Sequence, residues 1–427
     1  MNAPRLRPRV LVLDEELPWP PDTGKRIRTL NLLERLAGQF AIDLLVHDSG
    51  ASGPAIEQLR ARGIEPHLAP SRLPAKRGPL FAARLALNLL SPLPYSVASH
   101  YRRGYRAALA RLRAEREYDL LHCEWTPYAR YVLDDPLPRV IAAHNVESQV
   151  WERLAAVERS GARRAFLRLQ ARRMARFERR AVRAAGRATA VSAEDAAALR
   201  RMGCGSVAVV PNGVDTDHFR PGEPGREQAH QLVFTGSMDW RPNQDALRWF
   251  VDAVLPLLRR GGSVRLTVVG RNPPPELARP GALPPEVVLT GTVPDVRPFV
   301  SHAAVFVVPL RVGGGSRLKI LEALAMERAV VSTTIGAEGL DTTEGRDIVL
   351  ADDPAGFADA VERLMADEAR RRALGRAGRA LVLERYGWDA IAKIQAEFWL
   401  ECVDRSRLTE VFPAGPRRLS SSGSMPA

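Results

Sequence analysis

Residues 305–325 read VFVVPLRVGGGSRLKILEALA, and three local patterns follow one another in this stretch. An apolar run, typical of a strand that is buried on both faces, ends at Pro309. A loop of small residues comes next, formed by Gly313, Gly314, Gly315 and Ser316. An amphipathic segment then begins near Arg317 and predicts a helix. A strand, a glycine-rich loop and a helix in this order predict one unit of a parallel α/β sheet.

The loop and the helix after it have the composition of a phosphate site. Ligands of open parallel sheets bind beyond the carboxyl ends of the strands, where glycine loops and helix N-termini offer backbone N–H groups. Arg317 suits a forked grip on phosphate oxygens, and Lys319 supplies a mobile point charge. Glu322 shares a helix face with Lys319, so its carboxylate can accept hydrogen bonds from ribose hydroxyls. The alternative is a flexible loop before an ordinary amphipathic helix, and we favour phosphate binding.

The alternation of strand and helix extends to both sides of this stretch. Segments with strand composition occur in the second half at residues 230–236, 263–270, 287–291, 303–309, 329–333 and 347–351. Similar segments occur in the first half at residues 9–14, 41–48, 118–124, 139–145, 188–192 and 206–212. Helical periodicity between them is clearest at residues 25–38, 245–258 and 318–327. Two such runs predict two doubly wound parallel-sheet domains with helices on both faces.

The break between the two runs lies near residues 218–230, a polar stretch whose Gly and Pro content is typical of a linker. We therefore expect an N-terminal domain over residues 1–217 and a C-terminal domain over residues 218–387. The end of the chain, residues 406–427, lacks a core pattern and is expected to be a disordered tail.

The N-terminal half offers a partner for the phosphate loop. Its first strand is followed by PWPPDTGKRIRT, in which Gly24 permits a close backbone approach and Lys25 begins the next helix. A loop here would border the cleft from the other domain; the alternative is a Pro-rich connection with a solvated lysine. His144 lies near the carboxyl end of the segment 139–145, where a lone histidine is equally compatible with a structural and a catalytic role.

Composition narrows the class of protein. Hydrophobic residues make up 45% and charged residues 26% of the 427 residues, which is typical of a globular protein. The 62 Lys and Arg exceed the 49 Asp and Glu by 13, an excess that favours anionic partners. Three widely spaced cysteines predict neither a metal site nor a disulfide framework, and a reducing cytosol fits best. We recognise no secretory signal and no apolar run long enough to span a bilayer, and therefore expect a cytoplasmic protein.

Residues 160–187 contain ten arginines and one glutamate. Phe166, Leu169, Phe177 and Ala181 can share one face of a helix in this segment. One interpretation is a basic amphipathic helix that lies on an anionic membrane surface. The other, which we favour, is a connecting helix whose apolar stripe packs on the core.

Several segments follow one another in the order seen in retaining GT-B glycosyltransferases: PPDTGKRIRTLNLLERLA, AHNVES, VSAED, VVPNGVDTDHF, FTGSMDWRPNQDAL, FVVPLRVGGGSRLKILEALAMERAVVST and LERYGWDAI. Over about residues 9–395 the chain resembles these enzymes, and most of all the group-one, family-four glycosyltransferases of bacterial exopolysaccharide clusters. Any single segment is weak evidence, whereas the ordered set is specific. The resemblance implies the GT-B fold, in which two Rossmann-like domains face a central cleft and a C-terminal helix, here residues 388–405, crosses back to the first domain.

The same resemblance implies roles for individual residues. Glu322 matches the glutamate that binds the ribose of a nucleotide-diphospho-sugar donor, and Lys319 and Arg317 fall where its pyrophosphate is neutralised. His144 matches a histidine near the donor sugar, and Gly24 lies in the loop that faces the phosphates. The nucleotide is expected in the C-terminal domain, without a metal ion or a cofactor.

The chain also departs from the family pattern. A second glutamate is usual eight positions before the ribose-binding one, and Gly314 stands there. Many members carry an arginine after the strand that opens the C-terminal domain; Ser237 takes that position, and Arg241 is the nearest candidate to substitute for it. Lys25 stands where a second glycine of the N-terminal loop is common. These differences concern recognition of the donor sugar rather than the fold.

The expected reaction is transfer of the sugar to a sugar or lipid-linked acceptor with retention at the anomeric carbon. The resemblance implies attack from the leaving group's own face, with a phosphate oxygen as the base. Two other classes stay open: a nucleotide-sugar epimerase on the same architecture, which would need acid–base side chains around the sugar, and a basic nucleic-acid-binding protein. No nucleic-acid motif is recognised, so we expect no nucleic-acid partner.

Overall fold

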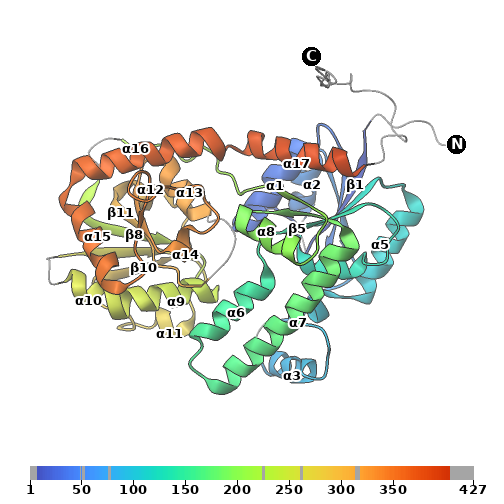
Figure 1. The fold of residues 1–427 in the computed structure, drawn as a ribbon, viewed down its shortest axis with the longest axis horizontal. Helices are drawn as coiled ribbons and strands as arrows, with labels where there is room; N and C mark the ends of the chain where they lie inside the picture. The colour runs from blue at the N-terminus through green and yellow to red at the C-terminus, as the bar shows by residue number, and fades with distance from the viewer. Residues whose placement is uncertain are drawn as a thin grey trace, which may run out of the picture.

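The computed structural model of the chain describes residues 7–48, 50, 53–75, 78–223, 227–259, 263–312 and 318–403. Two parallel sheets form the centres of two domains that lie side by side (Figure 1). The first has the order β3-β2-β1-β4-β5-β6-β7 and the second the order β10-β9-β8-β11-β12-β13. Every strand pair in both sheets is parallel, which confirms the predicted doubly wound α/β architecture.

The strands of the two sheets have the following bounds. Those of the first are β1 Arg9–Leu13, β2 Ala41–His47, β3 Ile64–Ala69, β4 Leu120–Cys123, β5 Arg139–Ala143, β6 Arg187–Ala190 and β7 Ser206–Val209. Those of the second are β8 Gln228–Thr235, β9 Arg265–Val269, β10 Val287–Gly291, β11 Ala303–Val308, β12 Ala329–Ser332 and β13 Val349–Leu350. The central strands are continuous apolar runs because helices cover both of their faces.

Helices cover each sheet. Those of the first domain are α1 Gly24–Leu36, α2 Gly53–Ala61, α3 Pro79–Asn88, α4 Tyr95–His100, α5 Arg103–Glu115, the short 3-10 helix Thr126–Tyr131, α6 Glu147–Val157, α7 Gly161–Ala185 and α8 Ala193–Arg201. Those of the second are α9 Arg241–Trp249, a π-helical turn Phe250–Val254, α10 Leu255–Leu258, α11 Pro275–Ala278, α12 Arg297–His302, α13 Leu318–Ala325, α14 Thr334–Ala337, α15 Pro354–Ala366 and α16 Glu368–Arg385. The last helix, α17, spans Trp388–Cys402.

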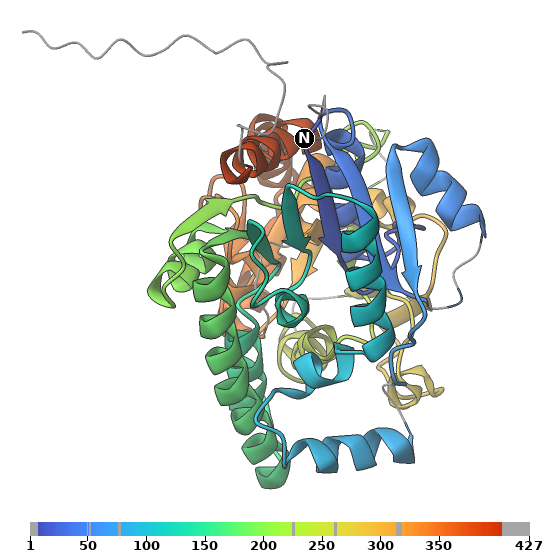
Figure 2. The ribbon, with the colours of Figure 1, turned by 90° about the vertical axis from the view of Figure 1, so that its right-hand side faces the viewer.

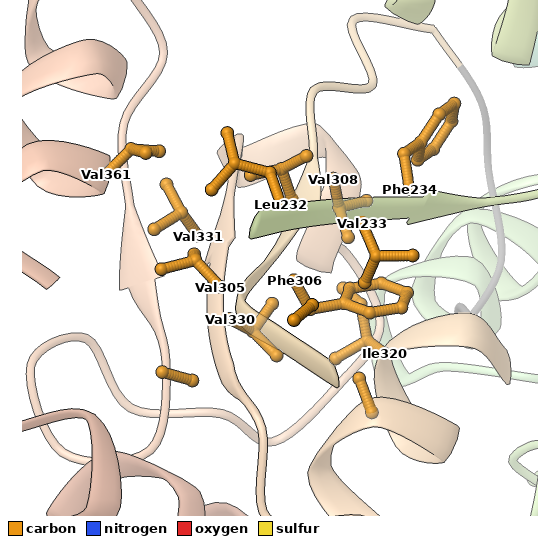
Figure 3. Packing of buried hydrophobic residues seen from close by; sticks show 14 of the residues in the cluster. Leu232, Val233, Phe234, Val305, Phe306, Val308, Ile320, Val330, Val331 and Val361 are labelled. Carbon is orange, nitrogen blue, oxygen red and sulfur yellow. The ribbon is translucent and has the colours of Figure 1, made fainter. Parts of the chain in front are cut away.

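The core of the second domain is built on β11. All six residues of this strand are buried, and Figure 3 shows Val305 and Phe306 among side chains from the neighbouring strands. Ile320 of α13 packs into the same cluster. The apolar segment therefore fixes the strand at the centre of the sheet, and the helix after the glycine-rich loop is held by its own buried face.

One expected helix is interrupted. The sequence predicts continuous α-helix over residues 245–258, whereas the structure has a π-helical turn between α9 and α10. Pro256 explains the difference, because it has no N–H to donate to the carbonyl of Asp252. A wider turn ahead of the proline accommodates its ring.

The basic segment 160–187 forms α7, a helix of 25 residues. Met174, Phe177 and Ala181 pack into the core of the first domain. Phe166 and Leu169, expected on the same face, are only partly buried, because the buried stripe instead continues through Leu167 and Ala171. The apolar stripe of α7 thus packs on the protein, as in the interpretation we favoured.

The chain passes between the domains twice, and the two passages lie side by side. On the first, the Val214 N–H donates to the Tyr386 carbonyl of the second at 2.9 Å. A Cβ on Gly213 would lie 2.7 Å from the ring of Trp388, so only glycine fits there. After this point α17 runs onto α1 (Figure 1), where Trp399 is fully buried. No helix of the described residues is long and apolar enough to cross a membrane.

Candidate active site

Lys319 lies at the carboxyl end of the second sheet, where the strand order reverses between β8 and β11. Its Nζ donates a hydrogen bond to Asn243 Oδ1 at 3.0 Å and lies 4.5 Å from the centre of the Phe234 ring. Asn243 Nδ2 in turn donates to the Ser237 carbonyl at 2.8 Å. The side chain of Asn243 therefore fixes the ammonium group at the place where sheets of this kind bind ligands.

A glycine makes this position of the ammonium possible. A Cβ on Gly236, just after β8, would lie 2.7 Å from Lys319 Nζ and 2.7 Å from Asn243 Nδ2. Such distances are shorter than a carbon atom tolerates, so any side chain here would displace the ammonium or the amide. The missing side chain of Gly236 thus provides the space that Lys319 occupies.

Glu322 follows Lys319 by one turn of α13 and is partly buried. Burial raises the pKa of its carboxyl to about 7, although the ammonium of Lys319 acts in the opposite direction. Its carboxylate has no hydrogen bond to any described residue. The carboxylate can therefore accept hydrogen bonds from a ligand that enters the site.

The N-terminus of α1 faces that of α13 across the boundary between the domains. A Cβ on Gly24, the first residue of α1, would lie 3.2 Å from Leu318 Cδ1 at the start of α13. Thr23 caps α1 by accepting the Arg26 N–H at 3.2 Å. Since a helix N-terminus carries unpaired N–H groups, two such ends at one boundary favour an anionic ligand between them.

Carboxylates at the end of β1 surround Lys25. The Lys25 ammonium forms an ion pair with Asp14 and lies 3.8 Å from Glu15. Burial disfavours this ammonium, but the two carboxylates outweigh burial and raise the pKa of Lys25. Burial also raises the pKa of Asp14, to about 6, against the opposing effect of Lys25. Lys25 is therefore neutralised by its own domain, which differs from the solvated lysine of the alternative interpretation.

His144 is held at the end of β5 by Glu124, which follows β4. Its Nε2 donates to the Glu124 carbonyl at 2.6 Å and lies 3.2 Å from Oε1 of the same residue. His122 Nε2 contacts the other carboxylate oxygen at 2.9 Å, and the two imidazoles hold the pKa of Glu124 well below its usual range despite burial. Trp399 of α17 donates to His122 Nδ1 at 3.2 Å, so this network reaches the C-terminal helix.

Two family profiles match consecutive parts of the chain. The profile of glycosyltransferase family 4 matches residues 55–218, and that of the group 1 glycosyl transferases matches residues 229–367. The chain is a group 1, family 4 glycosyltransferase. This assignment confirms the family to which the ordered sequence segments pointed.

Curated relatives resemble this glycosyltransferase at low identity. The "GDP-mannose-dependent alpha-(1-6)-phosphatidylinositol monomannoside mannosyltransferase" of Mycobacterium tuberculosis is 30% identical over 216 residues, which are 45% of this chain and 55% of the relative. The chain thus spans about half the length of the first curated relatives it matches. An "uncharacterized 44.6 kDa protein in cps region" of Klebsiella pneumoniae is 22% identical over 82% of this chain and 89% of its own length.

Solved structures support the fold. Sucrose-phosphate synthase from Thermosynechococcus elongatus superposes with a TM-score of 0.67 at 19% identity, covering 92% of this glycosyltransferase and 99% of that chain. HepE of Anabaena, solved in complex with UDP and glucose, superposes with a TM-score of 0.63 at 15% identity over 92% and 100% of the two chains. The two-domain GT-B fold expected from the sequence is thereby confirmed.

The glycosyltransferase carries a cation at this site that the sequence analysis did not single out. Arg271 follows β9, the strand next to β8, and its Nε donates to Ser237 Oγ at 3.0 Å. One of its terminal nitrogens also lies 3.3 Å from Asp22 of the first domain. Arg271 therefore lies beside Ser237, where the resemblance implied an arginine in many family members, and also contacts the first domain.

Arg241, the substitute that the sequence suggested, is exposed at the start of α9. It acts on Glu158 of the first domain, whose pKa is lowered chiefly by the Ser160 N–H and to a smaller extent by Arg241. The five residues Gly313, Gly314, Gly315, Ser316 and Arg317 lie outside the described residues. Of the predicted residues, the structure thus brings together Lys319 and Glu322, with Gly24 close to the same helix start.

The sequence analysis also did not identify the acids that contact Lys25 and His144. Asp14 and Glu124 each follow an apolar strand directly, and that position was the available signal in the sequence. Within the described ranges, no group of three or more His, Cys, Asp or Glu side chains is arranged to hold a metal ion.

Proposed function

We propose that this glycosyltransferase moves a sugar from a nucleotide-diphospho-sugar to a sugar or lipid-linked acceptor, with retention at the anomeric carbon. The observation that carries the proposal is the placement of Lys319 by Asn243 at the β8–β11 boundary. One helical turn away, the Glu322 carboxylate has no hydrogen bond to the part of the chain that the structure describes. Lys319 would contact the diphosphate, and Glu322 the ribose. HepE, which has the same fold and was solved in complex with UDP, supports a nucleotide donor by analogy.

The proposed transfer reaction depends mainly on electrostatic stabilisation by the protein. Breaking the bond between sugar and phosphate places negative charge on the leaving diphosphate, and fixed cations stabilise that charge more in the transition state than in the ground state. Lys319 of α13 and Arg271, which follows β9, provide such cations near the end of β8. In the proposed reaction the acceptor hydroxyl attacks from the face of the leaving group, and a phosphate oxygen takes its proton.

His144 is proposed to orient the donor sugar. Glu124 fixes its ring, because the Glu124 carbonyl can only accept a hydrogen bond and so places a proton on Nε2. Gly24 has no side chain, which lets the start of α1 lie close to Leu318 at the start of α13, where the diphosphate is proposed to bind. No cofactor and no metal ion are part of the proposal, since cationic side chains and helix N-termini perform the charge neutralisation.

The biological setting is proposed from the relatives. One matched relative is named for a phosphatidylinositol mannoside, and another lies in a cps region. Synthesis of a surface polysaccharide or a glycolipid from a cytoplasmic nucleotide sugar would fit both. A nucleic-acid partner is not part of the proposal.

The test is a nucleotide screen followed by a transfer assay, both with EDTA present. One nucleoside diphosphate should raise the melting temperature, because a ligand of the native state stabilises it. The matching nucleotide sugar should release nucleotide only when an acceptor is added, and NMR should show the donor's anomeric configuration in the product. Conversion of the donor alone to an epimer would reject transfer, and activity that returns only with a divalent metal would reject metal independence.

Arg271 and Arg241 form a matched pair for a second test. Arg271→Ala should weaken binding of the nucleoside diphosphate by about tenfold, because hydrogen bonds between arginine and phosphate are charge-assisted. Arg241→Ala should change the affinity by less than about twofold, since exposed charges contribute little. Isothermal titration measures both, and the opposite ranking would return the role to Arg241.

The Asp22→Asn variant distinguishes a phosphate contact of Arg271 from its ion pair with Asp22. Asp22 competes with a phosphate for the guanidinium, so its neutralisation should leave nucleotide affinity unchanged or increase it. A loss as large as that of Arg271→Ala would instead show that the ion pair between the domains, rather than a phosphate contact, produces the effect.

A further inference from the structure

Helix α3 exposes an apolar face that the protein does not cover. Leu80 and Leu87 lie two turns apart on one side of α3 and are 70% and 68% exposed. Leu90, just beyond the helix, is 87% exposed, and Leu89 beside it is 48% exposed. Figure 2 shows α3 at the lower edge of the first domain, away from the sheet. Large apolar side chains gathered in this way mark an interaction surface.

The helix is nevertheless firmly attached. Phe81 packs edge-on against Tyr95 with ring centres 5.7 Å apart. Asn88 is buried, and its Oδ1 accepts a hydrogen bond from Gln170 of α7 at 3.0 Å. Arg173 of α7 donates to the carbonyls of Asn88 and Leu89, both at 2.8 Å. Because these contacts hold the inner side of α3 in place, the leucines of the outer side form a fixed surface rather than a frayed segment.

A basic cavity of about 640 Å³ adjoins this surface. Residues 71–75, α3 and the start of α5 line it, and four of the lining side chains are arginines: Arg72, Arg84, Arg102 and Arg103. Arg84 belongs to α3 and stands between Leu80 and Leu87 on the same side. Among the described residues, no carboxylate pairs with any of these four guanidinium groups.

The sequence around the cavity has an unusual charge pattern. Residues 66–114 contain nine Lys or Arg and no Asp or Glu. The cationic side chains therefore have no acid of their own segment to neutralise them, and they attract anions. Exposed leucines beside unneutralised arginines are the combination by which a protein lies in the headgroup region of an anionic bilayer.

We infer that α3 and the four-arginine cavity dock this protein on an anionic membrane surface. Leu80, Leu87 and Leu90 would enter the boundary between headgroups and acyl chains, and the cavity would receive the phosphate of a lipid headgroup, which arginine binds in a forked manner. The apolar stripe of α7 is buried, so we assign the membrane contact to this surface and not to the amphipathic segment 160–187. The inference does not depend on the proposed function, because docking needs no donor.

The experiment is co-sedimentation of the full chain with vesicles of phosphatidylcholine, alone or mixed with phosphatidylglycerol. Wild type should bind only the mixed vesicles, and binding should fall with added salt. The triple variant Leu80→Ser, Leu87→Ser, Leu90→Ser and the double variant Arg84→Glu, Arg103→Glu should each lower the partition by about tenfold or more. Equal binding to both vesicle types, or binding to neither at low salt, would overturn the inference.

Matched controls test the location. Leu383→Ser on α16 removes a leucine that is 54% exposed, and Arg176→Glu with Arg180→Glu reverses two exposed charges of α7. These controls should keep most of the wild-type binding; losses equal to those of the α3 and cavity variants would overturn the assignment to this surface. Thermal unfolding checks the fold of each variant. If the triple variant does not fold, the single variant Leu90→Ser replaces it in the vesicle assay, because Leu90 lies outside any helix.

A free anion is the competing occupant of the cavity. Isothermal titration with inorganic phosphate tests this alternative. If wild type binds phosphate in solution, the Arg84→Glu, Arg103→Glu variant does not, and wild type leaves mixed vesicles unbound at low salt, the cavity binds a soluble anion and the docking inference is wrong.

Discussion

Lys319→Ala should lower kcat by about a hundredfold or more, the scale on which enzymes lose activity with one preorganised electrostatic donor. Asn243 holds the ammonium at the end of β8, and Gly236 leaves the space for it. The charge is therefore in place before the sugar–phosphate bond breaks. It acts most strongly when the leaving diphosphate is most negative, so donor affinity should fall less than turnover.

Steady-state kinetics with saturating acceptor measure this effect, and Lys393→Ala is the matched control. Lys393 is an exposed lysine of α17, and its replacement should leave both kcat and KM unchanged. Lys319→Arg should rescue only part of the activity, because a planar fork does not reproduce a point charge. A Lys319→Ala enzyme with near-normal kcat and only a raised KM would show uniform binding, and would move the main role to Arg317, Arg241 or Arg271.

Glu322→Ala should weaken the nucleoside diphosphate by about fivefold to a hundredfold and leave free pyrophosphate almost unaffected. The carboxylate is partly buried and unpartnered within the described residues, so it is ready to accept the ribose hydroxyls that pyrophosphate lacks. Loss of one partner of such a hydrogen bond costs ~1–3 kcal/mol. Isothermal titration with the two ligands measures the difference, and equal weakening of both would reject the ribose contact.

The raised pKa of Glu322 adds a pH dependence to the same experiment. With a pKa of about 7, this carboxyl is mostly protonated one unit below and mostly ionised one unit above that value. Only the ionised form accepts two hydroxyl hydrogen bonds, so the ratio of nucleotide to pyrophosphate affinity should rise by up to about tenfold across that range. Glu322→Gln, which cannot ionise, should remove the rise; an unchanged slope in this variant would assign the titration to another group.

The sequence predicts the fold well where helices cover a strand on both sides. The central strands β1 and β11 are continuous apolar runs and were recognised for that reason. The edge strand β3 was missed, because only three of its six residues are buried and Pro66 interrupts its pattern. A proline is tolerated there since an edge strand leaves some of its N–H groups unpaired.

The candidate site likewise contains some residues that the sequence could predict together and others that it could not. Lys319 and Glu322 could be predicted together because they are neighbours on one helix face, a relation that sequence spacing contains. Arg271 could not, because it lies 34 residues from Ser237 and meets it only through the pairing of β8 with β9. The contact of Glu124 with His144 likewise depends on the order of strands in the sheet, which the spacing of residues along the chain does not reveal.

The two side-by-side passages between the domains determine how the domains can move. The hydrogen bond from Val214 to Tyr386 joins the passages, so they act as one hinge line rather than two independent tethers. We therefore expect the domains to move relative to each other by rotation about this line. The ion pairs of Arg153 with Glu338 and of Asp22 with Arg271 join the two domains and must break before these contacts separate. Raised ionic strength, which screens exposed charge pairs, should therefore favour this separation without unfolding either domain.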